Sequence, residues 1–468
     1  MSFLRRFGVP VLIVLVIWSL TTHGKFSDSG DEPHYLMIAE SLFSDRDLNL
    51  DNNYAHGSGR WFGADKLESG PHGLRTASGE LRPWHDVGLP VLILPVYAVA
   101  TRFAAQMPES TLARFRQTRG LFGYSLISLS LICLTAWAAS MLLSGLRRVT
   151  TERIAVAVVL ALTLSPPVMG HAFLVFPETP AFAIVCLVVW LICLRDSELT
   201  IGRVLAVVAA VGLMPWLHRK FSFISFGLLW LIAVRHWQWI RARKPADWAL
   251  LGLLGFATHG ALHLWTAIQW GSVGGAYGTD GTPLAVAGMP RGALGLLFDR
   301  ERGLVSYAPI FLIVPACWAL TWRGTWRVAV PALLLFLPMA AFVEWNAGFS
   351  PPTRYIVPIL PLFAFASARA FEHPLIRRAA LPLLAFQVLI TAYCWQHPRA
   401  LWPKEVGTNQ ALEGIPFIGP AYERALPSLL TGDSIAGGWM WVGVVVLGSA
   451  LLARSTERGT RNAERGTV

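Results

Sequence analysis

The sequence predicts an all-α, polytopic membrane protein of about twelve transmembrane helices, with further helices lying along the membrane surface in a long first outer loop. Three observations predict this class. Of the 468 residues, 54% are hydrophobic and only 14% are charged, which is too apolar for an ordinary soluble protein. The apolar residues form blocks as long as a bilayer requires. The charged residues are concentrated between these blocks.

The predicted spans follow these blocks along the chain. The first block resembles a signal peptide, but no convincing cleavage site follows it, so we expect it to remain as a span with a cytoplasmic N-terminus. The spans are expected at residues 8–23, 120–144, 153–171, 178–194, 201–217, 221–240, 248–269, 304–322, 326–344, 355–371, 378–395 and 436–453.

A further apolar run at 87–106 is expected to lie along the membrane rather than to cross it. If this run crossed, every later basic loop would fall on the outer side, against the tendency of Lys and Arg to stay in cytoplasmic loops. Two prolines, Pro90 and Pro95, and the charge of Arg102 also weaken it as a plain span.

With this choice, residues 1–453 form a single transmembrane domain. Its outer loops are 24–119, 270–303 and 396–435, and residues 454–468 are expected to form a disordered cytoplasmic tail. The net charge of +11 comes from the cytoplasmic loops, so we expect no nucleic-acid partner. The five cysteines lie in apolar segments and predict packing residues rather than a disulfide framework.

Charged residues at the outer membrane surface are costly and mark candidate functional sites. In "GDEPHYL", Asp31 and Glu32 open a helix whose first turn contains Pro33. One interpretation is that Asp31 only caps this helix and Glu32 only complements its dipole. The other is a catalytic carboxylate base, with His34 and Tyr35 beside it, and the sequence leaves open which of the two acids is the base.

Two outer turns add further charges. Glu178 lies between two prolines and is either a helix-start acid or part of the site. His218, Arg219 and Lys220 share one short turn, where they either anchor the protein to lipid head groups or bind a phosphate. We favour a phosphate site, because three donors converge in this turn.

The remaining candidates precede helices elsewhere in the chain. Arg300 and Arg302 belong to a charged cluster that either binds substrate or pairs within itself at little energetic gain. Arg354 can pair with a phosphate or with one of the acids. His85 and Asp86 suggest a metal, but their ligand set is incomplete, so no metal or other cofactor is expected. The predicted substrate-binding residues of these segments are His85, Asp86, Arg300, Arg302, Tyr307, Arg354 and Tyr355.

Carboxylates that face cations suit the transfer of a sugar from a lipid phosphate. A carboxylate can deprotonate the attacking hydroxyl. A phosphate leaving group needs positive charge to stabilise it rather than a strong general acid. Because nucleotide sugars are lacking on the outer face, the activated sugar would arrive there on a lipid carrier, which accounts for a catalyst within the membrane.

Several short motifs, taken in order, resemble the GT-C superfamily of polyprenyl-phosphate-sugar glycosyltransferases. The likeness is to bacterial members related to protein O-mannosyltransferases and to the aminoarabinose transferases of lipid A. It covers the chain from about residue 1 to 395. The motifs are Asp31-Glu32 after the first span, Gly88-Leu89-Pro90, Pro177-Glu178, and the stretches "PWLHRKF", "FDRERGLVSYAP" and "TRYIVPILP".

The resemblance implies that Asp31 is the base that activates an acceptor hydroxyl, with inversion at the sugar carbon, at the periplasmic face of a bacterial inner membrane. It implies a polyprenyl-phosphate-linked sugar as donor and a glycan, lipid or protein as acceptor, besides contact with membrane lipids. The alternatives are a transporter or flippase of a lipid-linked saccharide, which would also need outer cations, and a scaffold for envelope assembly. Transporters are usually built from inverted repeats, which this sequence does not show.

Overall fold

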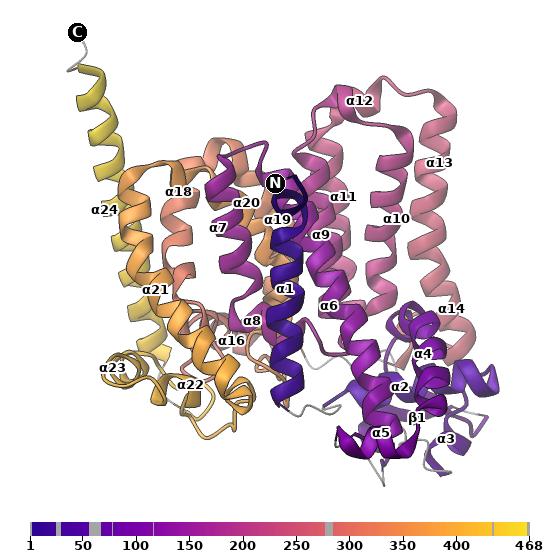
Figure 1. The fold of residues 1–468 in the computed structure, drawn as a ribbon. Coiled ribbons are helices and arrows are strands. Elements are labelled where there is room, and N and C mark those ends of the chain that lie inside the picture. The colour runs from indigo at the N-terminus through magenta and orange to yellow at the C-terminus, as the bar shows by residue number, and fades with distance from the viewer. Residues whose placement is uncertain are drawn as a thin grey trace.

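Long apolar helices lie side by side and make up most of the chain (Figure 1). The computed structural model describes residues 2–24, 30–55, 67–76, 78–115, 117–276, 284–432 and 435–465. Parts of the predicted outer loops and of the predicted tail lie outside the described residues, at 25–29, 56–66, 77, 116, 277–283, 433–434 and 466–468.

The predicted polytopic helical class is confirmed. Among the described residues, six helices are long and apolar enough to cross a membrane: Gly88–Gln106, Arg119–Leu146, Pro245–Trp270, Pro309–Ala341, Pro374–Gln396 and Ile435–Thr456. Shorter apolar helices accompany them at Phe7–Thr21, Glu178–Ile192, Ile201–Leu217, Val286–Phe298 and Arg354–Ala368. The predicted count of about twelve spans therefore requires that shorter helices also cross the membrane, because the long helices alone are too few.

The bundle is built from long helices that run between its two ends and from shorter helices packed among them (Figure 1). Their order along the chain is α1 (Ser2–Gly24), α6 (Arg119–Leu146), α7 (Glu152–Thr163), α8 (Pro166–His171), α9 (Glu178–Ile192), α10 (Ile201–Leu217), α11 (Ser222–Arg235), α13 (Pro245–Gly255), α14 (Ala261–Trp270), α16 (Met289–Phe298), α17 (Leu304–Tyr307), α18 (Val314–Thr325), α19 (Ala329–Ala341), α20 (Leu360–Ala368), α21 (Pro374–Gln396) and α24 (Ile435–Arg465). The core lies where α6 packs against α9, and small residues allow this approach. A Cβ added at Gly145, for example, would lie 3.1 Å from the Cα of Trp190.

The two ends of the bundle carry different structures. Both termini and the short helix α12 (Trp237–Arg241) lie at one end (Figure 1). The opposite end, called the loop end below, carries the segments predicted to form the first and last outer loops. They contain α2 (Glu32–Glu40), α3 (Asp51–Ala55), α4 (Gly88–Gln106), α5 (Glu109–Arg114), α22 (Gln410–Glu413) and α23 (Ile418–Ala425).

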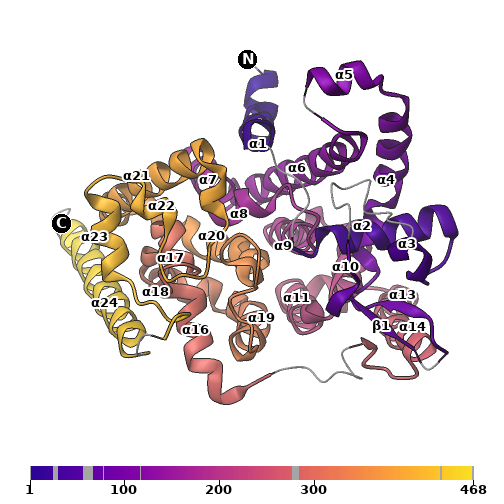
Figure 2. The same cartoon turned by 90° about the horizontal axis from the view of Figure 1, so that it is seen from below.

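Helix α4, which covers the ambiguous apolar run, lies across the loop end. Figure 2 shows α9 and α11 end-on but α4 from its side, which is the orientation expected of a helix along the membrane surface. The start of α4 abuts the end of α10, where a Cβ added at Gly88 would lie 2.2 Å from the carbonyl oxygen of Trp216. The glycine of the "GLP" motif is therefore required by a close backbone contact.

Two local expectations are corrected. The chain is not entirely α-helical, because β1 (Gly73–Arg75) and β2 (Leu81–Pro83) pair as a small antiparallel hairpin with Gly73 opposite Pro83 and Arg75 opposite Leu81. Where a disordered tail was predicted from residue 454, α24 continues as a helix to Arg465. Its polar extension is rich in Arg, Glu and Ala, which favour helix even without an apolar face.

Candidate active site at the loop end

Four charged side chains from four distant segments form one continuous ion-pair network at the loop end. Arg354 is its centre: Nη2 lies 2.7 Å from Asp31 Oδ2, and Nε lies 3.0 Å from Glu178 Oε1. Lys220 Nζ contacts the same oxygen of Glu178. The fold therefore brings together two predicted acids and two predicted cations, with their charges balanced.

Helix starts and tight turns place these four side chains. Asp31 directly precedes α2, Glu178 is the first residue of α9, Lys220 lies in the 3₁₀ turn η5 (Arg219–Phe221), and Arg354 begins the 3₁₀ segment η10 (Arg354–Ile359). Gly30 makes the turn into α2 with a positive φ of 56°, which glycine tolerates best.

Asp31 is the exposed end of the network. Its side chain is 25% exposed, against 8% for Arg354 and 0% for Glu178. It makes no capping hydrogen bond, whereas its backbone carbonyl accepts the N–H groups of His34 and Tyr35. Burial opposes ionisation of Asp31, but the charge of Arg354 and the hydrogen bond from it outweigh burial and hold the pKa of Asp31 below its usual value. Asp31 is therefore ionised at neutral pH, and its carboxylate is accessible to a substrate.

The neighbouring acid, Glu32, has a different environment. It is fully buried, and its Oε1 accepts hydrogen bonds from the Tyr124 hydroxyl at 2.9 Å and from the Val175 backbone N–H at 2.7 Å. These bonds tie α2 to α6 and to the segment before α9. Glu32 thus holds the elements of the site together, and the geometry favours Asp31 as the acid that meets a substrate.

The two cations of the network are packed on aromatic rings. The Arg354 guanidinium lies 4.0 Å from the centre of the Phe176 ring, and Lys220 Nζ lies 4.8 Å from the centre of the Tyr355 ring. Burial lowers the pKa of Lys220 to about 8, although its ion pair with Glu178 opposes this shift. Lys220 therefore keeps its positive charge at neutral pH, but a modest rise in pH would deprotonate it.

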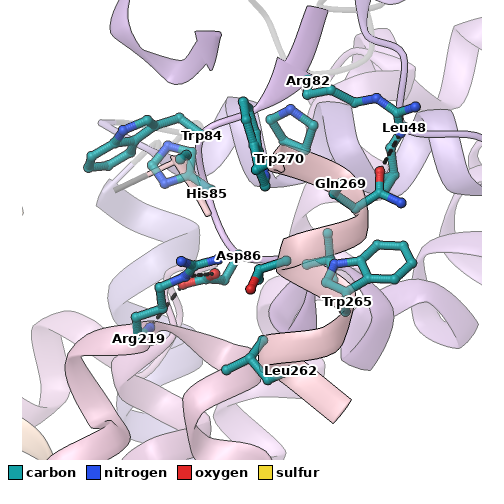
Figure 3. A pocket seen from close by; sticks show the side chains of 14 residues that line it. Leu48, Arg82, Trp84, His85, Asp86, Arg219, Leu262, Trp265, Gln269 and Trp270 are labelled. Atoms are coloured by element: carbon teal, nitrogen blue, oxygen red, sulfur yellow. Dashed lines mark hydrogen bonds and ion pairs between the residues drawn. The ribbon is translucent and has the colours of Figure 1, made fainter. Parts of the chain in front are cut away.

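A second ion pair lies beside a pocket (Figure 3). Arg219 Nε lies 3.0 Å from Asp86 Oδ1, and the Arg219 backbone N–H donates to Asp86 Oδ2 at 2.9 Å. Arg82 Nη1 donates to Gln269 Oε1 at 2.8 Å at another wall. The pocket lies between α14 and the segment that joins β2 to α4, and its lining comprises Leu48, Arg82, Pro83, Trp84, His85, Asp86, Val87, Arg219, Leu262, Trp265, Thr266, Gln269, Trp270 and Ala276.

Three histidines of the first outer loop gather next to Asp31. His72 Nδ1 lies 2.9 Å from His85 Nε2, and the rings of His72 and His34 are stacked with centres 3.6 Å apart. His34 Nδ1 is hydrogen-bonded to the Tyr54 hydroxyl at 2.8 Å. Because burial lowers the pKa of His34 to about 3, this ring is neutral at neutral pH.

Buried polar atoms without a hydrogen-bond partner are frequent in and around this network. The described part of the chain contains twelve such side-chain atoms, and four of them lie here: the Tyr35 hydroxyl, His85 Nδ1, His171 Nε2 and Glu178 Oε2. Since buried polar groups in proteins are normally paired, this concentration indicates a place where water, an ion or a substrate completes the site.

Three predicted residues lie elsewhere in the fold. Arg300 donates to the carbonyl oxygens of Leu426 and Gly407, and Arg302 donates to the Ser350 carbonyl and pairs with Glu405. Tyr307 is buried in α17. Within the described residues, no ion pair or hydrogen bond is found between any of these three and the Asp31 network. The contacts of the two arginines fasten the last outer loop, rather than pairing the charged cluster within itself.

Several residues near the network carry no signal in the sequence alone. His72 reaches Asp31 only because the β1–β2 hairpin brings it opposite Trp84 and next to His85. Phe176 lies next to Pro177-Glu178, and only its contact with Arg354 in the structure identifies it as part of the site. Of the tryptophans of α14, Trp265 lies in the predicted span 248–269 and Trp270 directly follows it, and aromatic residues are common where a span meets the interface.

Comparison with known proteins identifies the fold. No family model and no curated protein sequence matches the chain. The crystal structure of ArnT from Cupriavidus metallidurans bound to undecaprenyl phosphate is 12% identical, with a TM-score of 0.50, and the match covers 96% of this chain and 76% of that one. The chain has the fold of ArnT. ArnT in the apo state is 13% identical, with a TM-score of 0.49 over 95% of this chain and 72% of that one.

This likeness confirms the resemblance to the GT-C fold that the motifs predicted. At 12% identity this likeness shows the fold only. The choice of site residues therefore rests on the contacts described above.

Proposed function

We propose that this protein is an integral membrane glycosyltransferase that moves a sugar from a polyprenyl-phosphate carrier to an acceptor hydroxyl. The observation that carries this proposal is the network in which a reachable carboxylate, Asp31, is paired to Arg354 and, through Glu178, to Lys220. A fold shared with a protein whose crystal structure holds undecaprenyl phosphate supports the choice of a lipid phosphate as carrier.

The proposed reaction uses each charge in a defined role. The acceptor oxygen attacks the anomeric carbon while Asp31 takes its proton, and the bond between that carbon and the phosphate oxygen breaks. The electron pair leaves with the polyprenyl phosphate, and attack from the opposite face inverts the anomeric carbon. The negative charge that develops on the phosphate is stabilised by Lys220 and Arg354.

Both cations retain hydrogen-bonding capacity for a phosphate. An ammonium group has three N–H donors and a guanidinium group has five, more than the ion pairs of Lys220 and Arg354 use. Glu178 holds the two cations together, so that they face the phosphate as a pair. Arg219, held by Asp86, adds a third positive charge at the neighbouring pocket.

We place the sugar or the acceptor in the pocket beside Asp86 and Arg219. Its tryptophans, Trp84, Trp265 and Trp270, offer broad apolar faces, and its polar groups offer hydrogen bonds, a combination typical of small-molecule sites. His85 lines this pocket and also belongs to the cluster around Asp31, so a molecule bound there would lie next to the base.

The loop end is proposed to face the periplasm of a bacterial inner membrane. The N-terminus, the C-terminus and the basic segment of α12 lie together at the opposite end, which is the arrangement expected of a cytoplasmic side. The acceptor would then be a glycan, lipid or protein of the cell envelope.

Reconstitution into liposomes tests this proposal. Purified protein would be given a panel of polyprenyl-phosphate sugars with envelope extracts as acceptor, and released polyprenyl phosphate and glycosylated product would be measured by mass spectrometry. We expect both products to form in equal amounts. The alternative function, a flippase, predicts that the lipid-linked sugar moves across the bilayer intact and that no polyprenyl phosphate is released, which would contradict the proposal.

A further inference from the structure

The turn that joins α18 to α19 combines exposed tryptophans with exposed arginines. The end of α18 contributes Trp322 and Arg323, and the 3₁₀ turn η9 (Trp326–Val328) contributes Trp326 and Arg327. The two tryptophans are 51% and 40% exposed, and both arginines are exposed. This turn lies at the end of the bundle that carries both termini, opposite the loop end (Figure 1). Tryptophan and arginine in this position are typical of the interface between the hydrocarbon and the lipid head groups.

The two arginines of this turn have no acidic partner in the part of the chain that the structure describes. None of its ion pairs includes Arg323 or Arg327. The Arg327 guanidinium lies 5.6 Å from the centre of the Trp326 ring, a contact that leaves its charge unbalanced. The turn after α6 differs, because its exposed Arg147 is paired with Glu152. The α18–α19 turn therefore presents two positive charges that an anion can balance.

A tryptophan of α11 connects this turn to the neighbouring helix. The ring centres of Trp230 and Trp326 lie 6.3 Å apart. Three residues before Trp230, α11 approaches α19 so closely that a Cβ added at Gly227 would lie 2.7 Å from the Cα of Pro331. The arginines therefore lie at the end of a seam along which two membrane helices are in contact.

The surface along this seam is apolar and exposed. On α11 the exposed residues recur at intervals of three and four positions, which places them on one face of the helix, and α19 adds two leucines one turn apart. These residues are Phe223, Phe226, Trp230, Leu333 and Leu337. On membrane helices, exposed side chains of this kind face acyl chains rather than water. An apolar surface for acyl chains and positive charge for a head group thus meet at the α18–α19 turn.

We infer that this seam binds one anionic phospholipid from the leaflet at the end opposite the loop end. Arg323 and Arg327 bind the lipid phosphate, because a planar guanidinium matches phosphate oxygens in bidentate fashion. Trp230 and Trp326 lie at the level of the glycerol, and the acyl chains follow α11 and α19. A lipid without an ammonium group is favoured, because its negative charge is not cancelled within the head group.

A second basic segment supports an anionic lipid at this end. Directly after α12, the chain carries the exposed Lys244 and the half-buried Arg243, whose guanidinium lies 4.3 Å from the centre of the Trp239 ring. Clusters of basic residues beside a membrane span attract anionic lipids. The inference is independent of the proposed transferase reaction, since Asp31 and its network lie at the loop end.

Native mass spectrometry of the full-length protein in detergent tests this inference. The protein is titrated with dioleoyl phosphatidylglycerol and, separately, with dioleoyl phosphatidylcholine, and the apparent Kd of each bound lipid is recorded. We expect one molecule of phosphatidylglycerol to bind more tightly than any phosphatidylcholine. The double variant R323Q/R327Q should bind phosphatidylglycerol about 30-fold more weakly, because each interfacial cation contributes about 5-fold.

Arg147→Gln is the matched control, because Arg147 is an exposed arginine at the same end whose charge Glu152 already balances, and the affinity should stay unchanged. Both substituted arginines of the double variant are exposed, so it is expected to fold, which size-exclusion profiles and thermal unfolding would verify. Glycerol phosphate, which has no acyl chains, should not displace the bound lipid. The inference is overturned if phosphatidylglycerol binds no more tightly than phosphatidylcholine, if R323Q/R327Q binds it as tightly as R147Q, or if glycerol phosphate displaces it.

Discussion

Asp31 and Glu32 are neighbours in the sequence but lie in opposite environments. Glu32 is fully buried and accepts two hydrogen bonds that fasten α2 to the bundle, whereas Asp31 is partly exposed and pairs with Arg354. A carboxylate that accepts short bonds from a hydroxyl and a backbone N–H is a structural anchor. The residue with spare acceptor capacity at the surface is the one that can take a proton, and we assign that role to Asp31.

Glu178 is predicted to be the structural centre of the cation pair. Glu178→Gln removes the carboxylate that forms ion pairs with both Lys220 and Arg354, which are both nearly buried. Because it leaves buried positive charges next to each other, the substitution should lower the free energy of unfolding by about 3–5 kcal/mol. Thermal unfolding in detergent would measure this change.

Glu109→Gln is the control for that substitution. Glu109 pairs with Arg119 at 3.4 Å, but its side chain is 82% exposed, so its loss should change stability little. An unfolding temperature of E178Q equal to that of E109Q would show that Glu178 does not hold the two cations.

The pKa of Lys220 predicts a pH dependence of donor binding. Burial lowers this pKa from 10.5 to about 8, so the ammonium group is fully present only well below pH 8 and is lost as the pH rises through that value. We expect KM for the lipid-phosphate donor to rise above pH 8 in the wild-type protein. In Lys220→Arg the guanidinium stays charged, so the rise should disappear.

Kinetics between pH 6 and 10 would measure this effect, with kcat recorded separately because it reports on Asp31 as well. A donor KM that is flat through pH 9 in the wild-type protein, or that rises equally in K220R, would contradict the assignment of Lys220 to the phosphate.

At the scale of elements, the start of α2 is the most constrained part of the site. Gly30 has a φ of 56°, and a Cβ placed on it would lie 2.7 Å from the carbonyl oxygen of Phe349. The same turn carries Asp31 toward Arg354, which begins the segment directly after the Phe349 loop. The position of the base is thus set by contact between two backbones that are more than 300 residues apart.

Gly30→Ala should therefore impair transfer more than it impairs folding. We expect kcat to fall by about 100-fold, because a displacement of the order of 1 Å at a catalytic group has effects of this size. Gly79→Ala is the matched control: Gly79 also has a positive φ, 89°, but nothing lies within 4 Å of its added Cβ. Equal activities of G30A and G79A would show that the contact with Phe349 does not position Asp31.

The hairpin β1–β2 shows where the sequence was insufficient at this scale. Its strands have three residues each, so neither provides enough alternation to be distinguished from a loop. The sequence therefore presents His85 and Asp86 without His72, because only strand pairing brings His72 Nδ1 to within 2.9 Å of His85 Nε2.

At the scale of the whole molecule, the sequence predicted the architecture better than the contacts. Long apolar blocks and the placement of basic loops require one end of the bundle to carry the outer segments, and the fold gathers α2, α4, α22 and α23 there. The motifs around Asp31, Glu178, Lys220 and Arg354 meet at that end. The sequence predicted that Arg354 could pair with one of the acids, but it did not identify the partners, because each ion pair joins segments that the sequence does not relate.

The group at Arg300 and Arg302 shows the limit of the same reasoning. Arg300 and Arg302 precede a predicted span on the outer side, as Arg354 does. Counting charges in the sequence therefore cannot distinguish an arginine of the site from one that holds a loop. The structure separates them by partners, since Arg300 and Arg302 bind carbonyl oxygens and Glu405 of the last outer loop. Buried carbonyl groups need donors, and arginine supplies several at once.

The central claim is that Asp31 is the base of a sugar transfer from a lipid phosphate. Its most direct test compares wild-type protein with Asp31→Asn, measuring transfer rate and the affinity for polyprenyl phosphate in the same preparation. Asp247→Asn, in the first turn of α13, is the matched control. We predict that D31N lowers kcat by about 10²–10⁴-fold while carrier affinity stays within a few-fold of wild type and D247N is unaffected. Transfer by D31N at the wild-type rate would contradict the account.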